Sequence, residues 1–406
     1  MTNQNRRLTM NANQAKYPQL RFKGFTDPWE QRKLGDLGLN ISDGDWIEKQ
    51  HIFENGQYRI IQTGNIGVDE YLDKPQNAKY FRQEDFNQLK ANEIFPGDIV
   101  VCRLADPAGR AVILPNIGKQ MVTSVDVAIL RPSSRISFRF LVSQLNNPRN
   151  LKQVQIMASG STRTRISRKN LEREIIQLPN INEQKKIGSF FSILNSTIAL
   201  HQRKLAKLKE LKQGYLQKLF PKNGSKFPQL RFAGFADAWE QRKLGEVAEI
   251  KTGSRNHQDS VDNGKYPFFV RSEKVERLNE YDFDTKAILV PGDGRIGEIF
   301  HYYDGKFALH QRVYKVDNFK EVNPLYLLNL FKYKFKKHAL RLNAQGTVPS
   351  LRLPMFTNWN ILIPNLNEQQ KIGLFFQQLD SLIALHQRKL EKLQELKKGY
   401  LQKMFC

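Results

Sequence analysis

The chain carries one long segment twice, as LPNINEQKKIGSFFSILNSTIALHQRKLAKLKELKQGYLQKLF (Leu178–Phe220) and IPNLNEQQKIGLFFQQLDSLIALHQRKLEKLQELKKGYLQKMF (Ile363–Phe405). About 31 of the 43 aligned positions are identical. A repeat of this length indicates the architecture of the chain more directly than any local pattern does.

A shorter repeat precedes each long one: KYPQLRFKGFTDPWEQRKLGDL at Lys16–Leu37 and KFPQLRFAGFADAWEQRKLGEV at Lys226–Val247. The chain is therefore a tandem duplication, whose halves are joined by the turn-rich linker Pro221–Ser225. A period of about 200 residues indicates duplicated domains and not a solenoid.

The long repeats are predicted to be helices. Asn180 with Glu183, and Asn365 with Glu368, form capping-box-like starts. A heptad stripe follows each start, and Leu211 and Leu396 are expected to widen it. Its members are Leu194, Ile198, His201, Leu205, Leu208, Lys212, Tyr215 and Leu219, matched by Leu379, Ile383, His386, Leu390, Leu393, Lys397, Tyr400 and Met404. A helix of about 38 residues is about 55 Å long, and each helix buries the stripe of the other in an antiparallel coiled coil within the chain. The two lysines on the stripe are expected to snorkel.

Two more variable segments, 38–177 and 248–362, lie between the repeats. Short β-branched runs alternate there with Gly, Pro, Asn and Asp, which predicts strands in turn-rich α+β domains. The runs are Arg59–Ile61, Asp98–Val101, Ala111–Leu114, Val125–Leu130, Phe268–Val270, Ala287–Val290 and Gly297–Phe300. Asn55–Tyr58 is similar to Asn263–Tyr266, so we expect the two domains to share a fold.

Composition points to a polyanionic partner. The 406 residues include 64 Lys plus Arg against 40 Asp plus Glu, a formal charge of +24. Hydrophobic residues make up 40%, which suits packed cores. The two cysteines form no disulfide framework, and neither a secretory signal nor a membrane span is seen, so we expect a cytoplasmic protein.

The alternation of constant helices with divergent globular segments resembles the specificity subunits of type I restriction–modification enzymes. The resemblance rests on Trp29–Gly35 and Trp239–Gly245, on the two NEQ helix starts, and on the GYLQK ends at Gly214–Lys218 and Gly399–Lys403. The loop Gly160–Ser167 (GSTRTRIS) also resembles the family, whereas its counterpart Gln345–Arg352 lacks an early arginine.

The resemblance implies a pseudo-two-fold symmetric α+β chain with two target recognition domains. The expected boundaries are an N-terminal tail (1–15), recognition domain 1 (16–178, prefix 16–37), spacer helix 1 (179–222), recognition domain 2 (223–362, prefix 226–247) and spacer helix 2 (363–406). It further implies a non-catalytic subunit, each domain of which reads half of a bipartite, asymmetric site in double-stranded DNA. The helices would set the spacer and dock two methyltransferase subunits, which an endonuclease–translocase joins. S-adenosylmethionine, ATP and Mg are implied for those partners and no cofactor for this chain.

Catalytic motifs are weak. There is no phosphate-binding P-loop and no dinucleotide fingerprint. Asn323–Tyr326 superficially resembles the Asn-Pro-Pro-aromatic motif of amino methyltransferases, but its third residue is Leu. No catalytic or metal-binding residue is predicted. A self-contained methyltransferase or nuclease, or a non-specific nucleic-acid scaffold, stays open as an alternative.

The predicted DNA-binding residues are polar or basic and lie in loops of the variable segments, because Arg, Asn and Gln can read base edges and the rest can hold phosphates. They are Gln62, Thr63, Asn65, Arg163, Arg165, Arg168 and Lys169 in the first segment, and Lys251, Ser254, Arg255, Asn256, His257, Arg271, Lys274, Arg295, Arg312 and Arg352 in the second.

Overall fold

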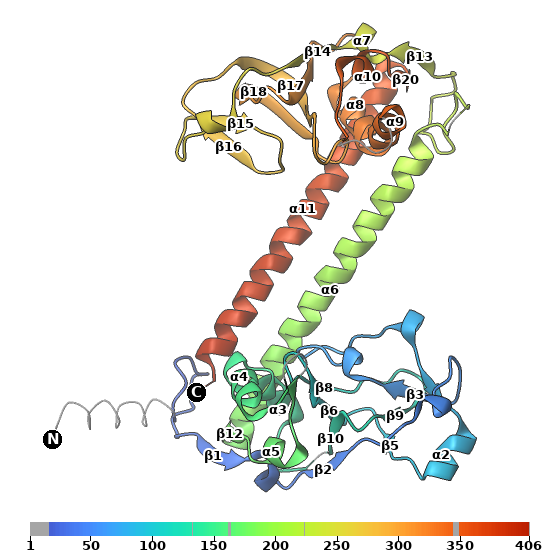
Figure 1. Cartoon of the computed structure of the whole chain (residues 1–406). Coiled ribbons are helices and arrows are strands. Elements are labelled where there is room, and N and C mark those ends of the chain that lie inside the picture. Colours follow the sequence, from blue (N-terminus) through green and yellow to red (C-terminus); the bar gives the residue numbers. More distant parts are fainter. Residues whose placement is uncertain (1–15, 132, 161–163, 223, 344–348, 406) are drawn as a thin grey trace, which may run out of the picture. The chain divides into compact units, whose positions relative to one another are not determined.

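The computed structural model describes residues 16–131, 133–160, 164–222, 224–343 and 349–405 (Figure 1). The chain divides into two compact units: unit 1 is Met1–Gln202 with Arg388–Cys406, and unit 2 is Arg203–Gln387. Two long helices, α6 (Ile181–Leu219) and α11 (Leu366–Lys403), each contribute residues to both units. No helix among the described residues is long and apolar enough to cross a membrane.

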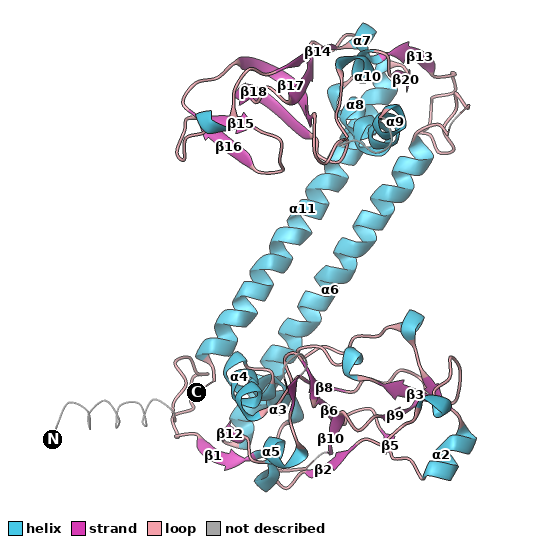
Figure 2. Cartoon of the chain, in the orientation of Figure 1, coloured by secondary structure: helices cyan, strands magenta, loops and turns pink. Residues whose placement is uncertain are grey.

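Unit 1 contains short strands with a few helices (Figure 2). Its elements are β1 (Glu30–Lys33), β2 (Asn40–Asp43), β3 (Tyr58–Ile61), β4 (Tyr80–Phe81), α2 (Gln83–Leu89), β5 (Glu93–Ile94), β6 (Ile99–Cys102), β7 (Leu104–Ala105), β8 (Ala111–Ile113), β9 (Gln120–Thr123), β10 (Val127–Arg131), α3 (Phe138–Leu145), α4 (Pro148–Met157), β11 (Thr164–Arg165), α5 (Arg168–Glu172) and β12 (Ile175–Leu178). Its two four-stranded sheets have the orders β2-β10-β6-β8 and β4-β3-β9-β5.

Unit 2 repeats this plan with one larger sheet. Its elements are β13 (Glu240–Lys243), α7 (Leu244–Val247), β14 (Glu249–Thr252), β15 (Tyr266–Phe269), β16 (Val275–Leu278), β17 (Phe283–Pro291), β18 (His301–Leu309), β19 (Val313–Asp317), α8 (Pro324–Leu330), α9 (Lys336–Leu342), α10 (Leu353–Thr357) and β20 (Asn360–Ile363). The six strands run β14-β19-β17-β18-β15-β16, and β15 pairs with β18 in parallel as β3 does with β9. The predicted mixed fold, shared by both domains, is confirmed.

One predicted strand is wrong. Gly297 and Glu298 lie in a turn, Ile299 and Phe300 follow without regular structure, and β18 begins only at His301. Gly297 has φ +66°, in the left-handed region, and a Cβ there would lie 2.6 Å from Lys336 Cα of α9. The close approach of α9 therefore imposes a bend that the apolar letters alone did not indicate.

Each NEQ motif joins a long helix to the rest of its unit. Asn180 Oδ1 accepts a hydrogen bond from Glu183 N at 3.0 Å, as the capping prediction requires. The Glu183 carboxylate does not return to the cap, however. It is fully buried and accepts two 2.8 Å bonds from Arg21, a residue of the short repeat. Gln184 in turn donates to Pro179 O and accepts from Ser137 N, so the start of α6 is fixed from two sides.

Unit 2 repeats these contacts one by one. Asn365 caps Glu368 at 3.0 Å, and Arg231 donates two 2.8 Å bonds to the buried Glu368 carboxylate. Gln369 donates to Pro364 O and accepts from Asn323 N. The residues shared by the two repeats are therefore those that bind the prefix, the helix start and the globular domain together.

In both units α6 and α11 run antiparallel. In unit 1, Phe190 near the start of α6 contacts Tyr400 near the end of α11, with ring centroids 5.0 Å apart. In unit 2, Tyr215 near the end of α6 contacts Phe375 near the start of α11, also at 5.0 Å. The predicted interface side chains Leu194, Ile198, His201, Leu205, Leu208, Tyr215, Leu379, Ile383, His386, Leu390, Leu393 and Tyr400 are all buried or half-buried. The coiled-coil prediction agrees with this pattern.

Four residues near the stripe differ from expectation. The stripe lysines do not snorkel: Lys397 Nζ lies 3.4 Å from Asp69, and Lys212 pairs with Asp380. Each lysine therefore meets a carboxylate at the helix pair. Leu211 and Leu396 do not widen the stripe, because each is 41% exposed.

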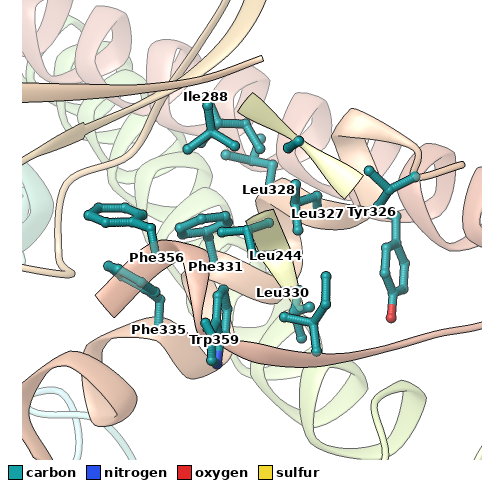
Figure 3. Close-up of a cluster of buried hydrophobic side chains, with 14 of the residues drawn as sticks. Leu244, Ile288, Tyr326, Leu327, Leu328, Leu330, Phe331, Phe335, Phe356 and Trp359 are labelled. Carbon is teal, nitrogen blue, oxygen red and sulfur yellow. The ribbon is translucent and has the colours of Figure 1, made fainter. Parts of the chain in front are cut away.

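The cores of the two units differ at one equivalent position. Leu34 N donates to Glu174 O at 2.8 Å, and Leu244 N donates to Trp359 O at 2.9 Å. Trp359 packs in an aromatic cluster with Phe331 and Phe335 (Figure 3).

Glu174 is 1% exposed, and no described residue gives its carboxyl oxygens a hydrogen bond of good geometry. Burial raises the pKa of Glu174 to about 8, partly opposed by the Asn150 side chain.

The buried ion pair predicts a specific stability loss. Arg21→Met leaves the Glu183 carboxylate buried without its partner, which costs about 3–5 kcal/mol of unfolding free energy. We expect a clear fall in the melting temperature of unit 1 by calorimetry, and a smaller one for Arg21→Met with Glu183→Gln, which removes the buried charge. Arg149→Met on the exposed surface of α4 is the control within unit 1 and should shift the melting temperature little. Equal shifts for Arg21→Met and Arg149→Met would contradict the assignment.

The Glu174 carboxyl predicts a pH dependence. Its pKa is higher in the folded chain (about 8) than its ordinary value of 4.5, so between these values only the folded state holds the proton. Stability from this group is therefore present at low pH and is lost as pH rises from 4.5 to about 8, by at most about 1.4 kcal/mol per pH unit. Glu174→Gln should flatten this slope in unfolding measured from pH 5 to 8. Glu84→Gln, at an exposed position of α2, should retain it.

Candidate nucleic-acid interface

A tight turn between two strands organises the loops of each unit. In unit 1 it joins β9 to β10 through Ser124–Asp126, and in unit 2 it joins β18 to β19 through His310–Arg312. Val127 N donates to Ser124 O and Val313 N to His310 O, each at 2.9 Å, so the turns have the same form. Burial lowers the pKa of His310, and its Nδ1 accepts a 2.9 Å bond from Arg312 N.

The loop after β2 or β14 lies directly over this turn. Asp45 N donates to Thr123 O at 3.0 Å, and Val125 N donates to Asp45 O at 2.9 Å. In unit 2, Arg255 N donates to Leu309 O at 3.2 Å, and Gln311 N donates to Arg255 O at 2.9 Å. A glycine is required before each bridge, since a Cβ on Gly44 or Gly253 would lie 2.3 or 2.0 Å from a carbonyl oxygen.

A third segment reaches the same turn. Arg103 N donates to Asp126 O at 2.8 Å. Arg103 O in turn accepts a 2.9 Å bond from Ile166 N, and Ile166 belongs to the predicted loop around Arg165. In unit 2, Gly292 N donates to Arg312 O at 2.8 Å and Leu351 N to Gly292 O at 2.6 Å. The described parts of the loops predicted to bind DNA, residues 164–169, 251–257 and 350–352, thus converge on equivalent turns.

In unit 1 the predicted arginines are held by carboxylates. Arg165 lies 3.2 Å from Asp126, and Arg168 lies 3.7 Å from Asp43 and 3.3 Å from Glu172. Lys169 is exposed and forms no ion pair with a described residue. Arg163 lies outside the described residues.

The predicted group Gln62, Thr63 and Asn65 belongs to a short 3-10 turn after β3. Gln62 is exposed, but Asn65 is buried. The Asn65 side chain accepts from Gln62 N at 3.0 Å and donates to Leu72 O at 2.9 Å, so its amide holds the turn together.

In unit 2 the paired residues are Arg255, Arg271, Arg295, Lys251 and His257. Arg255 donates to Asp282 at 2.8 Å and to Glu280 at 2.9 Å, and these bonds raise its pKa. Arg295 lies between Glu273 and Glu298 at 3.0 and 2.8 Å. The contacts of the other three are 3.3 Å for Arg271–Asp293, 3.2 Å for Lys251–Glu249 and 3.0 Å for His257–Glu276.

The remaining predicted residues of unit 2 are exposed. Lys274, Arg312 and Arg352 form no ion pair with a described residue, and Ser254 is likewise exposed. Asn256 accepts a 2.6 Å bond from Gln311 Nε2. Unpaired cations can bind phosphate without first losing a partner, so these positions are the most available to a polyanion.

Among the described residues no three His, Cys, Asp or Glu side chains gather as a metal site would require. The loops present cations, amides, hydroxyls and carboxylates around each turn, and the cations and amides among them are groups that can bind phosphates and base edges.

Comparisons with known proteins identify the family of this chain. The model of the type I restriction modification DNA specificity domain matches residues 26–210 and 236–395. The chain belongs to this family. The prediction of a restriction–modification specificity subunit is confirmed. This family membership places the chain among the non-catalytic subunits of these systems.

Specificity subunits from distant organisms are similar to this chain. That of the Escherichia coli EcoDI enzyme is 30% identical over 159 residues, covering 39% of this chain and 34% of the relative. That of the Methanocaldococcus jannaschii MjaVIII enzyme is 24% identical over 404 residues, covering 89% and 92%. A crystal structure of a type I system S subunit from M. genitalium has TM-score 0.71 at 17% identity, covering 96% of this chain and 99% of that one, which shows a shared fold.

The difference between free and paired arginines predicts different mutational effects. Arg312→Ala removes an unpaired cation, so DNA affinity should fall about tenfold and the salt slope by about one counterion. Arg295→Ala removes a cation already neutralised by Glu273 and Glu298, so affinity should change by less than about twofold. Fluorescence anisotropy over a range of salt concentrations measures both. The reverse order of effects would show that the ion pairs open on binding.

Proposed function

We propose that the chain is the DNA-reading subunit of a type I restriction–modification complex, in which each unit reads one half of a bipartite, asymmetric site. The observation that carries this proposal is that one loop framework occurs twice with different side chains. Asp45 in unit 1 and Arg255 in unit 2 make the same backbone contacts, and Asp126 corresponds to Arg312 in the same way. At both positions the side chain is acidic in unit 1 and basic in unit 2. Equivalent positions with unlike chemistry suit two unlike half-sites.

The long helices are proposed to set the spacer between the half-sites. α6 and α11 are continuous, of 39 and 38 residues, and each contributes to both units. A continuous helix fixes the separation of its two ends at about 1.5 Å per residue, whereas the end-to-end distance of a flexible linker varies.

The outer surfaces of the helices are proposed to dock the methyltransferase subunits. Leu200 and its repeat counterpart Leu385 are 42% and 40% exposed, and Leu211 and Leu396 are both 41% exposed. An apolar pattern present once in each repeat suits two copies of the same partner. These partners would bring S-adenosylmethionine, and an endonuclease–translocase joining them would use ATP and Mg; the assembly would act in the cytoplasm.

Sequencing of modified bases tests the function directly. Cells that carry this chain with its partner subunits should show a split, two-part methylated motif that is absent without the chain. Methylation by the purified chain alone would favour a self-contained enzyme, and binding that ignores sequence would favour a non-specific scaffold.

The spacer role predicts the effect of a length change. We would duplicate the heptads Leu205–Leu211 and Leu390–Leu396, because seven residues preserve the phase of the stripe. Each helix then grows by about 10 Å, the length of about three base pairs. The methylated motif should keep both half-sites and gain about that spacer length. Seven Gly and Ser residues inserted after Gly224 form the control, which should leave the spacer unchanged. An unaltered spacer in the heptad variant would refute the role.

A further inference from the structure

Trp46 lies in the loop after β2, a segment that the sequence patterns did not single out. Its side chain is 72% exposed, whereas Trp29, Trp239 and Trp359 are 2%, 1% and 5% exposed. The chain has four tryptophans, so Trp46 is the one whose indole faces solvent. It makes no hydrogen bond, ring stack or cation–π contact with another described residue.

The backbone on both sides of Trp46 is fixed. Asp45 is bonded to the turn at Thr123 O and Val125 N, and its carboxylate accepts from Asn92 N at 2.7 Å and Nδ2 at 2.9 Å. Ile47 packs against the buried cluster that includes Tyr58 and Phe81. The indole is therefore presented outward by an anchored loop. Single exposed apolar side chains are common on protein surfaces, but Trp46 is presented by an anchored loop that is bonded to the turn on which the predicted DNA-binding loops converge.

The surroundings of Trp46 are those of the candidate interface. Two residues before Asp45, Asp43 contacts both Arg103 and Arg168. Asp126, in the turn beneath the loop, contacts Arg165. Asp43 and Asp126 are thus engaged by arginines and Asp45 by the Asn92 amide, so none of these three carboxylates is free to repel a polyanion at this loop.

The equivalent loop in unit 2 presents a different side chain. Asp45 and Arg255 occupy the same bridge position, with Ser124 and His310 as their partners. The residue that follows the bridge is Trp46 in unit 1 and Asn256 in unit 2. One position therefore offers an apolar ring in one unit and an amide in the other.

We infer that Trp46 is a specificity-determining residue of unit 1, which contacts bases of its half-site through apolar and stacking interactions, and that Asn256 takes the same place in unit 2. The inference rests on the proposed function. An indole can pack on a thymine methyl group or on the face of a base at a deformed step, whereas an amide can bridge an adenine edge. The loop pair accordingly supplies two unlike base contacts from one backbone geometry.

The test uses the full chain assembled with its methyltransferase subunits and duplexes carrying the motif found by methylation sequencing. Competitor duplexes are altered in one half-site or the other. Trp46→Ala should lower discrimination at one half-site at least tenfold and leave the other within twofold. Trp46→Phe should retain most of the discrimination, and Asn256→Ala should act on the opposite half-site.

Fluorescence gives an independent readout. The difference in emission between the wild-type and Trp46→Phe complexes isolates Trp46, and cognate DNA should protect this component from acrylamide. Duplexes altered in the half-site that Trp46→Ala affects should protect it less.

Three results would overturn the inference. Unchanged discrimination by Trp46→Ala at both half-sites is the first, and a Trp46 component that stays fully quenchable in cognate DNA is the second. Loss of subunit assembly by Trp46→Ala is the third, since it would make Trp46 a protein contact. If instead the wild-type complex ignores both half-sites, the proposed function itself fails, which is a distinct outcome.

Discussion

Two buried ion pairs hold together parts of each unit that lie far apart in the sequence. Arg21 reaches Glu183 across 162 positions, and Arg231 reaches Glu368 across 137. Both carboxylates are almost completely buried, so neither can lose its arginine without a large desolvation penalty. The short repeat, the start of a long helix and the globular domain are therefore obliged to form together. This requirement accounts for the repetition of LRF and NEQ in both halves.

A fixed framework of this kind leaves other positions free to diverge. The core of unit 2 holds Trp359 where unit 1 holds the buried Glu174, and the same backbone bond to Leu34 or Leu244 persists. The loops over the turns diverge further, since Asp45 and Asp126 in unit 1 correspond to Arg255 and Arg312 in unit 2. The repeated contacts thus persist in both units while the loop side chains differ, as is usual where loops vary on a constant scaffold.

The sequence predicted what depends on local periodicity and on repetition. The helix caps at Asn180 and Asn365, the stripe and all but one of the named strands were recovered, because spacing along the chain determines them. Contacts between segments that lie far apart in the sequence were not recovered. Nothing near Gly297 in the sequence indicates that α9 packs against it, and nothing near Lys397 indicates Asp69. Trp46 was missed for the same reason, since its loop matches that of Asn256 only through strand pairing.

The ion pairs in the loops also change how the charge of +24 is understood. If every arginine were free, the chain would bind any DNA tightly, and sequence would matter little. Instead Arg165, Arg255 and Arg295 are each already engaged by carboxylates. A duplex would first have to displace those carboxylates, so these arginines add less to DNA affinity than the unpaired Lys274, Arg312 and Arg352. Internal pairing therefore lowers the sequence-independent affinity that a charge of +24 would otherwise give, which leaves side-chain differences between the two sets of loops more room to matter in the proposed function.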